Sequence, residues 1–315
     1  MKTHAPFVVT VGCLLTFISA PSAFADSMVY SANAGNNTVY TYDEGTKAPT
    51  LFETSATGVS SPTAMIYDSA DRTVFLADGP SNTIYQYDPG SGAVVSHFSP
   101  SSPSAPVSSV TAMTYDSAGN IVYVADATTR TVYQYDDFGV TAGQQFTTPP
   151  STVTPTAVAY DSIDRALFVG YDNGTIYRYD SAGAGTQITN SSGLGAVTAM
   201  TYDSGDGRLL TAYDNGTSQT IYRYDDLGGA VTENLFNDST DLGRVTAMTY
   251  DAFDRLVLVG YGNAIYDYDS SGTRSFFSST DVNGVTALAD VVPEPSTLAL
   301  VVLGAAALVT RRRSR

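Results

Sequence analysis

A four-residue segment, Tyr-x-Tyr-Asp, recurs six times along the chain at nearly even intervals. The aspartates that end its copies stand 44 to 48 residues apart, at Asp43, Asp88, Asp136, Asp180, Asp225 and Asp269. A second segment, Thr-Ala followed by Met, Val or Leu, also recurs six times and begins at Thr63, Thr111, Thr156, Thr198, Thr246 and Thr286. Repetition at this period indicates six copies of one supersecondary unit, each packed against its neighbours.

Each unit contains short apolar or aromatic runs that are separated by turn residues. Three such runs stand at 245–251, 255–261 and 264–269, and a weaker run follows each Tyr-x-Tyr-Asp, as at 94–98 and 274–277. Runs of this length and composition predict β-strands. Four antiparallel strands in a unit of about 45 residues are typical of one blade of a β-propeller.

The fragments at the two ends of the repeats complete one another. The first runs stand at 28–32 and 38–43, and a single first-strand run remains at 284–290. These runs are predicted to pair within one blade, because closing the ring removes the unpaired sheet edge that would otherwise promote aggregation. The sequence therefore predicts an all-β fold, a six-bladed β-propeller of four-stranded antiparallel blades over residues 26–290.

The first residues have the pattern of a secretory signal peptide. Lys2 precedes an apolar run at 7–18, and the small residues Ala23 and Ala25 flank Phe24 as in a signal peptidase site. We expect residues 1–25 to be removed. The alternatives are an uncleaved membrane anchor, for which the run is short of the roughly 20 residues needed, and a lipid anchor at Cys13.

The other end of the chain combines a proline motif, an apolar stretch and a cationic cluster. Pro293, Glu294 and Pro295 precede the apolar residues 298–309, and the last residues include Arg311, Arg312, Arg313 and Arg315. An apolar segment followed by arginines is a stop-transfer arrangement. The stretch is short for a permanent membrane span, which favours a transient sorting signal.

These three features, in this order, resemble the PEP-CTERM sorting signal, and the resemblance covers residues 291–315. It implies a Gram-negative, exopolysaccharide-producing bacterium and an exosortase that recognises and removes the tail. It also implies a transient membrane contact through a C-terminal transmembrane helix. A permanent C-terminal membrane anchor is the alternative.

A second resemblance concerns the body of the chain. Residues 76–79 (Leu-Ala-Asp-Gly) and 124–127 (Val-Ala-Asp-Ala) end short apolar runs at corresponding places in two units. This pattern is similar to the NHL and YVTN families of propellers. The resemblance implies the fold and leaves the function open, because one fold carries many functions.

The body of the chain is strongly acidic. Between residues 26 and 293 there are 10 basic and 30 acidic residues, a net charge of −20. Such a field repels nucleic acid and favours cations or cationic partners. We therefore expect no nucleic-acid partner.

Groups suited to catalysis are scarce outside the signal peptide. His97 is the one histidine there, in a fourth-strand run, and no cysteine is present; a catalytic base is most often histidine. The aspartates at strand ends are interpreted as turn formers. Tyrosine pairs such as Tyr85 and Tyr87 lie on one side of a strand and are predicted to pack between blades, although a sugar-stacking role is the alternative. We expect a protein that is not an enzyme.

If a ligand binds, we expect it on the face formed by the turns between second and third strands. The candidate residues on this face are Asp78, Asp126, Asp172 and Asp214. Oxygen ligands without histidine or thiolate suit Ca²⁺, and no other cofactor is expected. The alternative is that each aspartate caps its own turn.

Taken together, the sequence predicts an exported binding or structural protein of the cell envelope, outer surface or extracellular matrix. Signal peptidase and an exosortase are its expected processing partners, and polysaccharide or envelope proteins are its expected ligands. The alternative function is a propeller hydrolase or lyase that acts on polysaccharide or lactones through an Asp-rich metal site.

Overall fold

A computed structural model of the chain describes most of its body, and residues Ser27–Val292 form one compact unit. The described stretches are residues 28–54, 59–99, 101–102, 105–136, 143–147, 152–190, 193–216, 219–225, 232–238 and 242–291. The predicted signal peptide, its cleavage site and the sorting tail with its hydrophobic helix lie outside these residues, apart from Val291. Every regular element in the described stretches is a β-strand, and none of these stretches is a helix able to cross a membrane.

Six four-stranded antiparallel sheets make up the fold, and each is one blade. Blade 1 comprises β4 (Pro62–Asp68), β5 (Thr73–Asp78), β6 (Thr83–Tyr87) and β7 (Val94–Phe98). Blade 2 comprises β10 (Val110–Asp116), β11 (Ile121–Asp126), β12 (Thr131–Asp136) and β13 (Gln144–Gln145). Blade 3 comprises β14 (Pro155–Asp161), β15 (Ala166–Tyr171), β16 (Thr175–Tyr179) and β17 (Gly185–Asn190).

The second half of the ring repeats this order. Blade 4 comprises β18 (Ala196–Asp203), β19 (Arg208–Asp214), β20 (Gln219–Asp225) and β21 (Thr232–Asp238). Blade 5 comprises β22 (Val245–Asp251), β23 (Leu256–Tyr261), β24 (Ala264–Tyr268) and β25 (Arg274–Ser278). Blade 6 comprises β26 (Val285–Val291), β1 (Met28–Asn33), β2 (Thr38–Asp43) and β3 (Pro49–Thr54).

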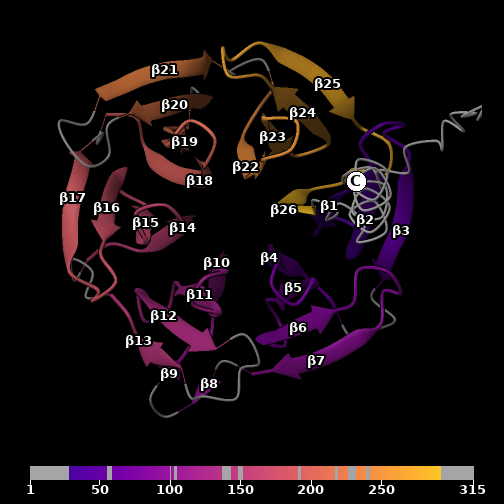
Figure 1. Cartoon of the computed structure of the whole chain (residues 1–315), viewed down its shortest axis with the longest axis horizontal. Coiled ribbons are helices and arrows are strands. Elements are labelled where there is room, and N and C mark those ends of the chain that lie inside the picture. Colours follow the sequence, from indigo (N-terminus) through magenta and orange to yellow (C-terminus); the bar gives the residue numbers. More distant parts are fainter. Residues whose placement is uncertain are drawn as a thin grey trace, which may run out of the picture. The chain divides into compact units, whose positions relative to one another are not determined.

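The blades stand around a central axis with their first strands innermost (Figure 1). Blade 6 joins both ends of the described chain, because β26 pairs antiparallel with β1 from Met28 opposite Val291 to Asn33 opposite Val285. The predicted six-bladed, all-β propeller and its closure by the two terminal segments are confirmed. A two-stranded hairpin of β8 (Ser101–Ser102) and β9 (Ala105–Pro106) between blades 1 and 2 was not predicted.

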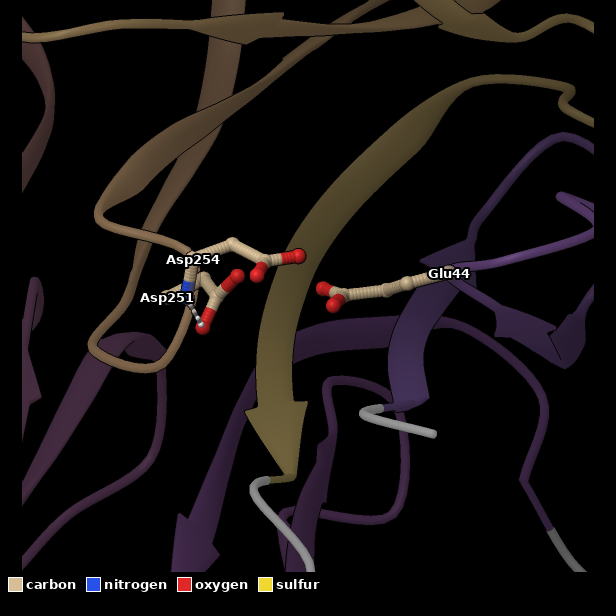
Figure 2. Close-up of side chains that lie close together, drawn as sticks. All are labelled: Glu44, Asp251 and Asp254. Carbon is tan, nitrogen blue, oxygen red and sulfur yellow. Dashed lines mark hydrogen bonds between the residues drawn. The ribbon is translucent and has the colours of Figure 1, made fainter. Parts of the chain in front are cut away.

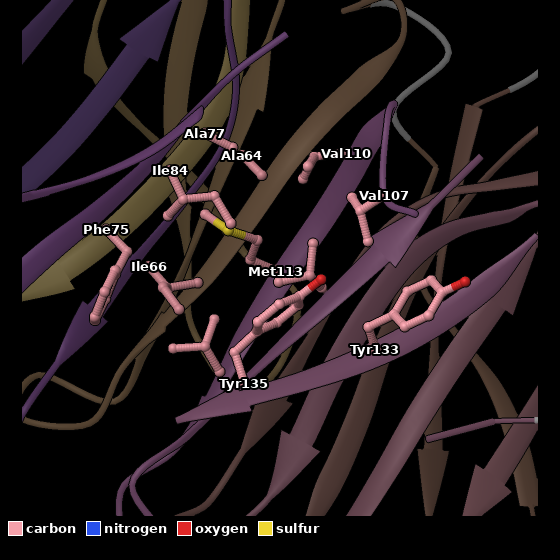
Figure 3. Close-up of a cluster of buried hydrophobic side chains, with 12 residues drawn as sticks. Ala64, Ile66, Phe75, Ala77, Ile84, Val107, Val110, Met113, Tyr133 and Tyr135 are labelled. Atoms are coloured by element: carbon pink, nitrogen blue, oxygen red, sulfur yellow. The ribbon is translucent and has the colours of Figure 1, made fainter. Parts of the chain in front are cut away.

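Buried side chains fill the spaces between neighbouring blades. Figure 3 shows the cluster between blades 1 and 2, where Phe75 and Ile84 of blade 1 share a core with Met113 and Tyr135 of blade 2. Similar clusters join the other blades. The fold is therefore held together by sheet-on-sheet packing around the ring, without a single central core.

The tyrosine pairs contribute to these clusters as predicted. Tyr87 is fully buried in the cluster between blades 6 and 1, and Tyr85 packs against the same cluster with its ring centroid 6.1 Å from that of Tyr87. Their role in interblade packing is confirmed.

The aspartates that end the first strands hold the following turns. Asp68 Oδ1 accepts hydrogen bonds from the amides of Ala70 and Asp71, at 2.8 and 3.2 Å. The corresponding bonds form at Asp116, Asp161, Asp203 and Asp251. Three of these turns end in a left-handed arginine, at Arg72, Arg165 and Arg255. The turn-forming interpretation of these aspartates is confirmed.

Candidate functional site

The innermost strands enclose a channel along the axis of the ring. At one end it opens between the first residues of these strands, and we call this opening the threonine mouth. At the other end it opens between their last residues, and we call this opening the tyrosine mouth. One ring of apolar side chains lines both cavities and separates them: Met65, Met113, Val158, Met200, Met248 and Leu288.

The threonine mouth is narrow, with a cavity of about 80 Å³. Its threonines are Thr63, Thr111, Thr156, Thr198, Thr246 and Thr286. Each hydroxyl donates to a backbone carbonyl of the adjacent second strand, at 3.1 to 3.4 Å. Thr286 Oγ1 also lies 2.7 Å from the Pro62 carbonyl oxygen of the next blade. The hydroxyls of these threonines therefore stabilise the blades through hydrogen bonds to the backbone.

The tyrosine mouth is wider, with a cavity of about 230 Å³. Five half-buried tyrosines and one aspartate surround it: Tyr67, Tyr115, Tyr160, Tyr202, Tyr250 and Asp290. Each residue stands one position before the end of its strand. Aromatic rings with polar tips thus surround most of this opening.

Hydrogen bonds between blades hold several of these rings in place. A tyrosine hydroxyl of one blade bonds to the carboxylate that ends the first strand of the preceding blade. The pairs are Tyr160 with Asp116, Tyr202 with Asp161, and Tyr250 with Asp203. Burial, together with Asp203, raises the pKa of Tyr250 to about 12, so this hydroxyl stays a neutral donor at physiological pH.

On the face of the threonine mouth, two of the predicted ligand residues are buried strand ends. Asp78 and Asp126 are 1% and 0% exposed. Asp78 Oδ1 accepts hydrogen bonds from the amides of Ser60 and Ser61, both at 2.7 Å. Asp126 makes the same pair of bonds with the loop before β10.

The other two predicted ligand residues have a different setting. Asp172 is exposed, lies one position beyond the end of β15, and accepts a hydrogen bond from the Thr154 amide at 3.1 Å. Asp214 accepts bonds from the Gly216 amide at 2.7 Å and from the Gln219 side chain. The structure thus brings none of the four carboxylates together, and their engagement favours the turn-capping alternative. The ligand face stays a prediction.

His97 lies on β7, the outermost strand of blade 1, and is exposed. Its ring centroid is 6.0 Å from that of Tyr85. The fourth-strand position predicted for His97 is thus confirmed, and the side chain is solvated and lies away from the channel.

The tyrosines of the first strands were missed at the level of sequence. Their signal was present, because Tyr-Asp ends five of the six Thr-Ala runs and Asp290 replaces the tyrosine in the sixth. The tyrosines singled out from the sequence are those of the third strands, such as Tyr85 and Tyr87, which the structure places between blades. Only the closed ring shows that the first-strand tyrosines share one opening.

Six four-stranded blades around a channel define the chain as a six-bladed β-propeller. Among solved structures it is similar to a chain of "Crystal structure of Nidogen/Laminin Complex", with a TM-score of 0.69 and 11% sequence identity. The likeness covers 84% of this chain and 98% of that chain. At this identity it shows the fold alone.

The C-terminal residues carry a PEP-CTERM protein-sorting motif, which matches residues 291–313. This motif implies export through an exosortase system. Residues 105–234 also match the family described as Teneurin YD-shell, a match that covers less than half of the chain and does not define its family. The comparison with curated proteins found no match.

Proposed function

We propose that this protein is an exported binding or structural module of the bacterial cell envelope or extracellular matrix. The sorting motif at 291–313 supports export and processing by an exosortase, and the propeller fold supplies a rigid ring for display. Signal peptidase would remove residues 1–25, and the exosortase would remove the tail that begins near Pro293 to Pro295. Polysaccharide or envelope proteins are the proposed partners.

The observation that carries the binding role is the tyrosine mouth. Half-buried tyrosine rings surround a cavity of about 230 Å³, and tyrosine suits sugar faces because its ring is apolar and its tip is polar. The cavity is smaller than the roughly 300 to 1,000 Å³ of sites for drug-sized ligands. A single sugar unit or a chain end is therefore the proposed ligand.

The charge of the protein narrows the class of saccharide. The body carries a net charge of −20, and Asp290 stands at the tyrosine mouth itself. An anionic polysaccharide would be repelled on approach. We infer a neutral saccharide.

We also propose that the protein is not an enzyme. Hydrolysis of a glycosidic bond needs two carboxyl groups on either side of the substrate. Around the tyrosine mouth the carboxylates of Asp116, Asp161 and Asp203 are held by turn amides and tyrosine hydroxyls. No observation favours the hydrolase or lyase alternative.

An array of neutral glycans, followed by calorimetry with the best binder, tests the proposal on the exported protein. Replacing Tyr67 and Tyr115 with serine should weaken binding at least tenfold, because stacking area at the mouth is lost. Tyr266→Ser is the matched control, since this half-buried tyrosine lies on a third strand away from the channel. Equal losses in all variants, or no neutral glycan bound, would refute the role of this mouth.

The processing proposal has its own measurement. The intact mass of the exported protein should lack the first 25 residues and the tail beginning near Pro293 to Pro295. An exported form that retains Arg311, Arg312 and Arg313 would instead show a permanent anchor.

A further inference from the structure

Asp251 ends the first strand of blade 5 but has different neighbours from the other strand-end aspartates. The next blade is blade 6, where Asp290 takes the place of the tyrosine. In blade 6 the first and second strands come from opposite ends of the described chain, so no turn joins them. The junction of blades 5 and 6, which we call the seam, therefore lacks both the tyrosine and the turn that face Asp203 in blade 4.

One oxygen of Asp251 is buried without a partner. The side chain is fully buried, and its Oδ1 accepts the amides of Phe253 and Asp254 at 2.7 and 3.1 Å. Its Oδ2 has no hydrogen-bond partner within the part of the chain that the structure describes. A buried, unpaired carboxylate oxygen is costly unless something compensates it.

Two further carboxylates lie beside this oxygen. Glu44 directly follows β2 of blade 6, and Asp254 lies in the turn after Asp251. One oxygen from each of the three side chains lies within 4.8 Å of the others. In Figure 2 the Asp254 amide holds one oxygen of Asp251, while the other oxygen points toward the carboxylates of Asp254 and Glu44.

The electrostatics of this cluster call for a positive charge. The Asp251 carboxylate is buried, and the carboxylates of Asp254 and Glu44 bring further negative charge beside it. Gathering like charges in this way is unfavourable unless a cation stands between them. A cation there would also supply the missing partner of Oδ2.

We propose that Glu44, Asp251 and Asp254 bind a divalent cation across the seam, with Ca²⁺ the best match. Three carboxylate oxygens are hard ligands, which exclude the metals that prefer thiolate or imidazole. Ca²⁺ accepts irregular sets of oxygen ligands completed by water, whereas Mg²⁺ demands near-octahedral geometry. The three residues come from two blades and from different strands, since Glu44 follows a third strand whereas Asp251 ends a first strand and Asp254 lies in the turn after it; such an irregular set suits the more tolerant ion.

The seam is distinct from the other strand-end positions. Asp68 Oδ2 is also buried without a hydrogen-bond partner, but among the described aspartates that end first strands only Asp251 belongs to a group of three acidic side chains this close together. The combination of an unpartnered buried oxygen with converging carboxylates carries the proposal. It is independent of the saccharide site proposed above.

The site would stabilise the closed ring by linking two neighbouring blades. Glu44 belongs to blade 6, and Asp251 and Asp254 belong to blade 5. A bound cation would tie the blade that contains both chain ends to the blade before it. Ca²⁺ binding should therefore stabilise the folded ring.

Calorimetric titration of the full chain with CaCl₂ tests the site. We expect one ion per chain with a Kd of about 10⁻⁴ to 10⁻³ M, the range of extracellular calcium modules. Glu44→Gln and Asp254→Asn should each weaken this binding at least tenfold. Asp203→Asn is the matched control, since Asp203 has the same strand position but faces Tyr250, and it should bind Ca²⁺ as the unmodified protein does.

A second readout follows the fold. At a free Ca²⁺ concentration tenfold above the Kd, the melting temperature should rise by about 3 °C, and Glu44→Gln should abolish this rise without changing the melting temperature in EDTA by a similar amount. No heat of binding at millimolar CaCl₂ in the folded protein would overturn the proposal. So would Glu44→Gln binding Ca²⁺ like the unmodified protein, and equal loss in Asp203→Asn would show that the acidic surface as a whole attracts the ion.

Discussion

The second strands of blades 1 and 2 end in aspartate, whereas those of blades 3, 4 and 5 have a tyrosine at the equivalent position, which is the last residue of β15 and β23 and the last but one of β19. The two aspartates, Asp78 and Asp126, are buried charges that accept backbone amides of the loop before the first strand. The three tyrosines pair their buried hydroxyls with a third-strand tyrosine of the same blade, at 2.5 to 2.7 Å. These pairs are Tyr171 with Tyr179, Tyr213 with Tyr224, and Tyr261 with Tyr268.

The difference shows that the loop before the first strand can be held in two ways, by a buried aspartate or by an exposed one next to a buried tyrosine. Where tyrosine fills the buried position in blade 3, the loop amide of Thr154 bonds instead to Asp172, one residue further along and exposed. Blade 6 has a third arrangement, in which the buried Asn33 accepts the amide of Asn283 at 3.2 Å. The end of the second strand therefore accommodates a buried carboxylate, a pair of tyrosine hydroxyls or an asparagine amide in different blades.

Breaking the ring should have the largest effect, because both kinds of blade depend on neighbours on each side. Deleting residues 284–290 removes all of β26 except Val291, together with buried side chains that include Val285 and Leu288. Large buried apolar side chains contribute about 1.5 to 3 kcal/mol each, against a total stability of about 5 to 15 kcal/mol. We expect the variant to unfold or associate through the exposed edge of β1, as measured by size-exclusion chromatography and thermal melting. A monomer with an unchanged melting temperature would contradict closure.

The aspartate blades are tested by removing a buried acceptor. Asp126→Ala leaves three amide donors without their carboxylate and should lower the free energy of unfolding by about 3 kcal/mol. Asp126→Asn should cost less, because Asn33 holds the equivalent loop in blade 6. Urea denaturation measures both. The control is Asp172→Ala in blade 3, which should change the free energy by less than about 0.5 kcal/mol because the side chain is exposed.

The tyrosine blades are tested by removing one hydroxyl. Tyr179→Phe leaves the buried Tyr171 hydroxyl without its partner at 2.7 Å and should cost about 1 to 2 kcal/mol in urea denaturation. Tyr177→Phe removes a hydroxyl that bonds to the exposed Gln187 and should have almost no effect. If both variants lose equal stability, the buried pair has no special role.

The smallest effect, and the sharpest contrast, lies in the pH dependence of stability. Burial raises the pKa of Asp78, but hydrogen bonds from Ser81, Ser61 and Ser60 outweigh it and lower the pKa below its ordinary value. The stability from Asp78 is therefore complete above about pH 4 and is lost as the pH falls through the lower, folded-state pKa. Asp78→Asn should flatten the acid limb of melting temperature against pH and leave the alkaline limb unchanged.

The tyrosine blades should respond at the opposite end of the pH range. Burial and the bond to Tyr179 raise the pKa of Tyr171. Its stability is complete below about pH 10 and is lost as the pH rises toward the higher, folded-state pKa. Tyr171→Phe should flatten the alkaline limb only. Identical pH profiles for the Asp78 and Tyr171 variants would erase the distinction between the two kinds of blade.

Much of the fold could be predicted from the sequence because the same pattern of strands and turns occurs in each of the six repeats. The strands at Thr38–Asp43 and Val94–Phe98 were predicted with the bounds that the structure gives, and the closing strand differs by one residue. The turn roles of the strand-end aspartates were also predicted, since a carboxylate two residues before an amide bonds locally. Strands and turns whose interacting residues all lie within one repeat can be predicted from the sequence of that repeat.

The candidate site was harder to predict, because its residues belong to different units. The four aspartates at Asp78, Asp126, Asp172 and Asp214 look alike in the sequence, but the structure divides them into buried strand ends and residues next to or within open turns. A shift of one position changes the face of a strand on which a side chain stands. Aspartates at similar positions in the repeats therefore differ in burial and in hydrogen-bond partners.

The sequence by itself determined the all-β architecture, the number of blades and the closure, because local strand and turn patterns repeat with a fixed period. Only the tertiary structure decided which side chains meet across blades: the tyrosines that share one mouth, and Glu44 beside Asp251 and Asp254. The physical reason is that contacts between blades depend on how the ring curves and where it closes. Residues 44 and 251 are far apart in the chain, and closure alone places their carboxylates within 4.8 Å.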